Sequence, residues 1–65
     1  MTKFQTKQVS MINIYLSQGM QDTAARSLSA LIRSAMTKKS QDELMALAIT
    51  YKLASNPEFI VNKFI

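Results

Sequence analysis

The sequence predicts an all-α protein in which the whole chain, residues 1–65, forms a single domain, a compact four-helix bundle with short loops. Three observations lead to this prediction. Apolar residues recur every three or four positions in successive stretches, as they do on one face of a helix. Residues that cap helices separate these stretches, and the chain's one glycine and one proline both fall at such boundaries.

The first helix is expected over "KFQTKQVSMINIYLSQG", residues 3–19. Val9, Ile12 and Leu16 have helical spacing, and Gly19 is placed to cap the C-terminal end. The segment "VSMINIYL" also alternates to some extent, as a strand does, but no second strand stands nearby to pair with it. A helix is therefore the preferred interpretation.

The second helix is expected from about Asp22 to about Lys38. Its apolar positions follow a helical stripe through Ala24, Ala25, Leu28, Leu31, Ile32, Ala35 and Met36. The small alanine side chains in this stripe allow a neighbouring helix to approach closely. This stretch has the most regular periodicity of the chain.

The third and fourth helices are each expected to follow a capping signal. Ser40 and Glu43 in "SQDEL" have the spacing of a capping box, and the helix that follows is apolar over most of its circumference. We therefore expect the third helix to be the central and most buried one. In "SNPEF", Pro57 suits the first turn of a short last helix, which leaves loops near Gly19, Lys39 and Ser55.

The composition argues against several classes of function. The chain has no cysteine and no histidine, which excludes disulfides, thiolate zinc sites and imidazole ligands. It has no glycine-rich phosphate loop, and its few carboxylates lie where helices are expected to begin. We therefore expect a protein that is not an enzyme, with no cofactor, no metal and no small-molecule substrate.

No apolar run approaches the roughly 20 residues that span a bilayer, and no signal-peptide pattern opens the sequence. The expectation is a soluble protein with no membrane partner, located in the cytoplasm (of the host cell if it is viral).

The charge distribution suggests an acidic partner. Eight Lys and Arg against four Asp and Glu give a net charge of +4. All four acids fall at expected helix beginnings, where they offset the helix dipole. The basic residues should then face solvent with few acidic neighbours along their own helices.

The leading prediction from this pattern is nucleic-acid binding, largely through backbone phosphates. Arg26 and Arg33 are two turns apart on one face of the second helix, and serine and threonine hydroxyls accompany them. Lys38 and Lys39 extend this basic face, with Lys3 and Lys7 assisting. The same pattern would also arise from an ordinary solvated helix face, and the sequence leaves that alternative open.

A second hypothesis is a protein-interaction module, either an adaptor or an inhibitor. Met11 and Ile14 share a side of the first helix that lies off the Val9–Ile12–Leu16 stripe. This helix therefore carries more apolar surface than one core contact needs, which is typical of a surface for a protein partner or for a homodimer.

The sequence also resembles two groups of known proteins. "LSALIRSAMTKKSQDEL" resembles part of the Hha/YmoA nucleoid-associated family through Leu28, Leu31, Ile32, Ser40, Asp42, Glu43 and Leu44. The later acidic and histidine positions of that family are absent from "MALAITYKLASN", so no partner recognition is implied. The chain, including "MTKFQTKQ" and "LASNPEFIVNKF", also resembles short proteins of T4-type phages. In size and helical make-up it is similar to the small protein that these phages encode beside their recombination helicase. That small protein is associated with an HRDC-like nucleic-acid-binding bundle. That resemblance implies an accessory role in DNA metabolism.

Overall fold

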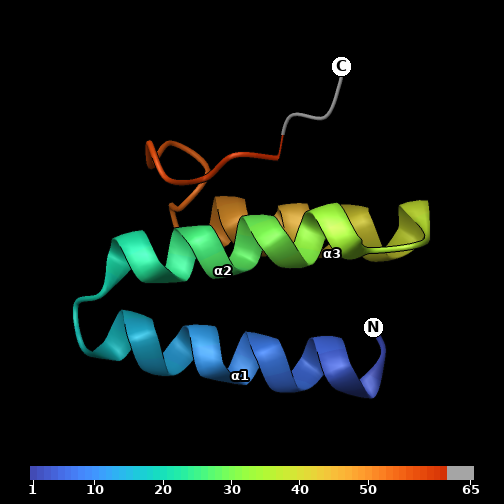
Figure 1. Cartoon of the computed structure of the whole chain (residues 1–65), viewed down its shortest axis with the longest axis horizontal. Coiled ribbons are helices and arrows are strands. Elements are labelled where there is room, and N and C mark those ends of the chain that lie inside the picture. Colours follow the sequence, from blue (N-terminus) through green and yellow to red (C-terminus); the bar gives the residue numbers. More distant parts are fainter. Residues whose placement is uncertain (62–65) are drawn as a thin grey trace.

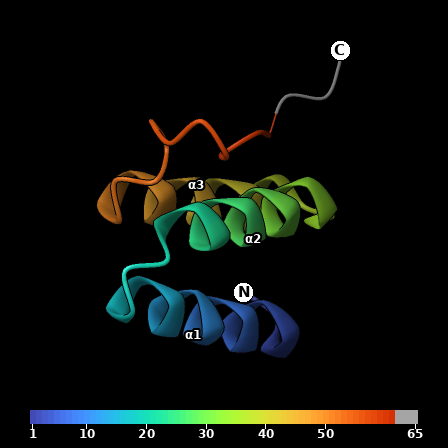
Figure 2. The ribbon, with the colours of Figure 1, turned by 60° about the vertical axis from the view of Figure 1, so that its left-hand side comes forward.

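The computed structural model describes residues 1–61 and confirms the all-helical class. Within these residues, three α-helices follow one another: α1 (Lys3–Ser17), α2 (Gln21–Ser34) and α3 (Lys38–Thr50). No strand occurs among residues 1–61. α2 packs against α1 on one side and against α3 on another, so it is the middle element of the fold (Figures 1 and 2). The prediction that the third helix is central is therefore wrong.

Both ends of α1 are defined by local hydrogen bonds. Thr2 caps the N-terminal end in a capping box: its hydroxyl accepts from the Gln5 amide, and the Gln5 side chain accepts from the Thr2 amide. At the other end, Gly19 has φ +74°, and the amides of Gly19 and Met20 donate to the carbonyls of Leu16 and Tyr15. This is a Schellman motif, and it confirms the role predicted for the glycine.

The boundary between α2 and α3 differs from the sequence-based prediction. α2 ends at Ser34, and the N-cap of α3 is Thr37, whose hydroxyl accepts from the Ser40 amide at 3.1 Å. The predicted capping box at Ser40 is thus wrong, because two cap-type residues stand three positions apart and the earlier one is used. A hydrogen bond from the Gln41 side chain to the Ala35 carbonyl holds this turn together.

The predicted fourth helix, and with it the four-helix bundle, is not confirmed. Between α3 and Val61 the chain forms turns and contains no helix; the remainder of the prediction, 62–65, lies outside the described residues. α3 ends in a second Schellman motif, in which Lys52 occupies the left-handed position with φ 60° and Leu53 donates to the Ala48 carbonyl. The segment after it then passes along the outside of α2 and α3 (Figures 1 and 2).

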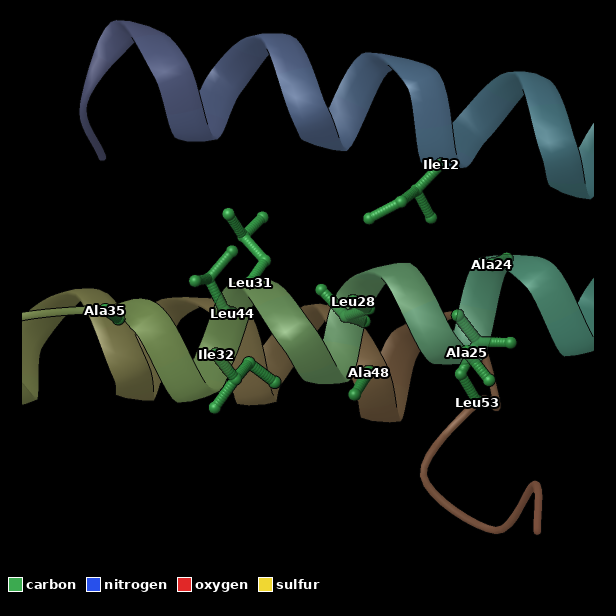
Figure 3. Packing of buried hydrophobic residues seen from close by; sticks show 10 residues of the cluster. All are labelled: Ile12, Ala24, Ala25, Leu28, Leu31, Ile32, Ala35, Leu44, Ala48 and Leu53. Carbon is green, nitrogen blue, oxygen red and sulfur yellow. The ribbon is translucent and has the colours of Figure 1, made fainter. Parts of the chain in front are cut away.

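The core lies mainly on the two packed sides of α2. Ile12 points from α1 towards α2, while Leu31 extends from α2 towards α1 (Figure 3). The buried apolar residues are Ile12, Ala24, Ala25, Leu28, Leu31, Ile32, Ala35, Leu44, Ala48 and Leu53. α2 supplies five of its residues to this set, counted from Gln21 to Ser34, whereas α1 supplies only Ile12.

Candidate interaction surface

The predicted basic residues are distributed over all three helices. Lys3 and Lys7 belong to α1, and Arg26 and Arg33 belong to α2. Lys38 and Lys39, which were expected to end the second helix, instead form the first turn of α3. They therefore stand at the positive end of a helix dipole, and no favourable dipole interaction accounts for them.

The two arginines of α2 contact the segment that follows α3. Arg26 Nε lies 3.1 Å from Glu58 Oε1, and Arg33 donates to the Ile60 carbonyl. Arg26 has no acidic partner on its own helix, but Glu58, from a distant part of the chain, opposes its charge, so the basic face is not unopposed there. The pair is exposed to solvent, so it stabilises the fold by only about 0–1 kcal/mol, and both side chains remain accessible.

The acidic residues are less uniform in position than the sequence predicts. Only Asp22 lies in the first turn of a helix, and its carboxylate accepts from the Asn56 side chain at 3.1 Å. Asp42 lies one turn further into α3, 3.4 Å from Lys38 Nζ, and Glu43 accepts from the N-terminal ammonium of Met1 at 3.2 Å. The carboxylates thus form contacts between segments as well as within helices.

α1 carries large apolar side chains on a face that does not reach the core. Phe4, Met11 and Ile14 expose 62%, 39% and 49% of their surface. At about 100° per residue, the three side chains fall within one narrow sector of α1, and Lys7 lies between them. We call Phe4, Met11 and Ile14 the α1 strip. The two residues predicted for partner binding, Met11 and Ile14, therefore belong to one surface.

Two surface hollows adjoin this strip, and Phe4 lines both of them. One, of about 160 Å³, is lined by Phe4, Gln8, Ala30, Leu31 and Ser34. The other, of about 400 Å³, is lined by Thr2, Phe4, Gln5, Ser34, Met36, Thr37 and Ser40. Phe4 from α1 and Ser34 from α2 line both, so the two hollows adjoin where α1 meets α2, and the larger one extends across the α2–α3 turn to the start of α3. We call the two adjoining hollows together the α1–α2 groove.

Sequence reasoning missed two residues of this surface. Phe4 is seven positions before Met11, which is the spacing that places two side chains on the same face, so the signal was present. Met36 was assigned to the apolar stripe of the second helix. It lies instead in the turn after α2, 95% exposed, because α2 ends two residues earlier.

Residues 1–61 contain no group of three or more metal-ligating side chains. Within the same residues no helix combines the length and apolar character needed to pass through a bilayer.

Comparison with known proteins adds no assignment. The chain matches no protein-family model, no curated protein and no solved structure.

Proposed function

We propose that this protein is a protein-interaction module, an adaptor or inhibitor acting in the cytoplasm, that binds its partner through the α1 strip. One observation carries the proposal: Phe4, Met11 and Ile14 are large, apolar and accessible, and they share one face of one helix. Scattered single apolar residues are normal on a protein surface, whereas a contiguous group next to a groove is typical of an interaction site.

The fold itself does not require these side chains. α1 packs on α2 through a different face, on which Gln5 and Ile12 are buried and Val9 and Leu16 are half-buried against the core. Around the helix axis this face lies about 140° from the α1 strip. A polar residue at each position of the strip would therefore leave the core intact, so folding alone does not account for the apolar residues there.

Photocrosslinking tests this proposal directly. We would place p-benzoyl-phenylalanine at Met11 and, as a control, at Ala46, an exposed residue of α3. In an extract of cells that make the protein, the probe at residue 11 should form adducts with another protein. The probe at residue 46 should form few, and Phe4→Asp should remove those at residue 11. Equal adducts at the two positions would contradict the proposal.

The adduct masses also distinguish a separate partner from a second copy of the chain. An adduct of twice the 7.3 kDa chain, together with a dimer in sedimentation, would identify a homodimer. A monomer over the full concentration range would exclude self-association as the function of the strip.

Nucleic-acid binding is a second proposal. It includes the accessory role in DNA metabolism that the resemblance to phage proteins implies. It is supported by the net charge of +4 and by Lys3, Lys7 and Lys39, which form no ion pair with any carboxylate among residues 1–61. Arg26 is a weaker candidate for a phosphate contact than the sequence suggests, because its guanidinium is paired with Glu58. Lys38 is likewise paired with Asp42, so the candidate phosphate contacts without a carboxylate partner among residues 1–61 are Arg33, Lys39, Lys3 and Lys7.

Fluorescence anisotropy with single-stranded, duplex and branched oligonucleotides at two salt concentrations tests this second proposal. Affinity should fall steeply with salt, and Arg26→Glu combined with Arg33→Glu should weaken binding without unfolding the protein. Binding that is unaffected by the double substitution would remove the arginines from the site.

A further inference from the structure

On the basis of the proposed function, we infer that the partner supplies an amphipathic α-helix with acidic flanks, and that this helix occupies the α1–α2 groove. The apolar side of the partner helix contacts Phe4 and Met11, and its carboxylates face Lys7 on one rim of the groove and Arg33 on the other. The partner helix then takes the place of a fourth helix in the bundle.

The shape of the groove suits a helix. α1 and α2 are consecutive antiparallel helices joined by a short turn (Figure 1). Residues of both helices line the groove. Ala30 and Ser34, which form its α2 side, are small, exposed residues, so a helix can approach α2 closely. Phe4 and Met11, which the partner helix contacts, lie about 10 Å apart along the axis of α1, which corresponds to about two turns of a partner helix.

Charge is arranged on both sides of the apolar part of the groove. Moving around α1 away from α2, the order of side chains is Gln8, Phe4, Met11, Lys7 and then Ile14, so Lys7 borders the part of the α1 strip that Phe4 and Met11 form. Moving around α2 away from α1, the order is Leu31, Ser34, Ala30, and then Arg26 and Arg33. Each rim therefore carries cationic groups, while the floor between them is apolar or small.

The acidic groups near these rims are few and already engaged. Glu58 is paired with Arg26, and the Asp22 carboxylate accepts from Asn56. α1 itself has no acidic residue between Lys3 and Ser17. Arg33 uses one guanidinium nitrogen on the Ile60 carbonyl, which leaves its remaining donors for a carboxylate.

The same charges argue against a second copy of this chain as the occupant. A symmetric pairing of two α1 strips would enclose Lys7 of each copy in an interface to which neither α1 helix supplies a carboxylate. Like charges at a helix interface are unfavourable, whereas opposite charges on flanking positions select a partner. An acidic helix of another protein satisfies both the apolar and the charged parts of the surface.

Three labelled synthetic peptides of about 15 residues test this inference. The first has leucine at the apolar positions of a helix and glutamate on both flanks. The second replaces every glutamate with lysine, and the third scrambles the first so that it has no apolar face. Anisotropy titrations with the full chain should show that the glutamate peptide binds about tenfold or more tightly than either of the others, because several rim charges act together.

Substitutions in the protein assign this binding to the groove. Phe4→Asp should weaken binding of the glutamate peptide by about tenfold or more, since it removes the shared wall of both hollows. The matched control is Ile49→Asp, the same change at a 68% exposed residue of α3, which should leave affinity unchanged. Lys7→Glu combined with Arg33→Glu should make the lysine peptide the tighter ligand.

The experiments distinguish failure of the inferred partner helix from failure of the proposed function. Equal affinity for the glutamate and lysine peptides, with loss on Phe4→Asp, would overturn the acidic partner and leave the interaction surface in place. No binding of either amphipathic peptide above the scrambled one would overturn the helix in the groove. A dimer crosslinked through residue 11 would make a second copy the occupant. The proposed function itself fails only if residue 11 forms no more adducts than residue 46.

Discussion

α1 and α2 are similar in length but use their apolar residues differently. In α2 the apolar side chains Leu28, Leu31 and Ile32 are buried, because this helix is packed between two others. In α1 the buried residues are only Gln5 and Ile12, while a second apolar face remains in solvent. Packing within the fold therefore explains the apolar residues of α2, whereas it does not explain those on the exposed face of α1.

The difference also concerns how each helix is stabilised. The N-cap position of α2 is Met20, which makes no side-chain capping hydrogen bond, so burial is the main contribution there. α1 buries little and has a capping box at one end and a Schellman motif at the other. Helix α1 is thus stabilised mainly by capping hydrogen bonds at its two ends, and α2 mainly by the burial of its apolar side chains.

The largest loss of stability should follow from truncating a buried side chain of α2. Leu28→Ala removes a fully buried side chain in contact with the core and should lower the free energy of unfolding by about 2–5 kcal/mol. Urea denaturation followed by circular dichroism measures the change. A loss below about 1 kcal/mol would mean that α2 is not the central packing element.

A smaller loss should follow from changing an end of α1. Gly19→Ala places a side chain at φ +74°, where no atom would obstruct the new Cβ, so the effect is backbone strain alone. We expect a loss of about 1 kcal/mol in thermal or urea unfolding. The complementary change is Lys52→Gly at φ 60°, which should leave stability unchanged or raise it slightly. Equal effects of the same sign at the two positions would contradict this account.

The end of α2 can be located by a pair of alanine substitutions. Thr37→Ala removes the cap of α3 and should cost about 1 kcal/mol of unfolding free energy. Ser40→Ala changes a residue inside the first turn, and the effect should stay within about 0.5 kcal/mol. The reverse order in urea unfolding would restore the boundary that the sequence suggested, with α2 extending to Lys38.

The smallest effect on folding is expected in the α1 strip. Phe4→Asp, Met11→Asp and Ile14→Asp each alter an exposed side chain and should change the free energy of unfolding by no more than about 0.5 kcal/mol. At Phe4 the new carboxylate would even lie in the first turn, where the dipole favours it. Binding should nevertheless be lost, as measured by crosslinking at residue 11 for Phe4→Asp and Ile14→Asp, and by anisotropy with the glutamate peptide for Met11→Asp. A large loss of stability would show that the strip serves the fold.

The candidate site could be predicted from the sequence only in part. Met11 and Ile14 were found because their positions lie off the core stripe of the first helix, and this needs only helical periodicity. Phe4 could have been found by the same reasoning. The groove beside it could not, because Ala30 and Ser34 become its second wall only when α2 lies against α1.

Local features of the sequence determined the helical class, the extent of α1 and its glycine cap, because caps and periodicity act over a few residues. Tertiary structure decided which helix is buried, which of Thr37 and Ser40 begins α3, and that Arg26 meets Glu58. These outcomes depend on contacts between segments far apart in the chain, where the free energies of several packings compete, and no short stretch carries that information.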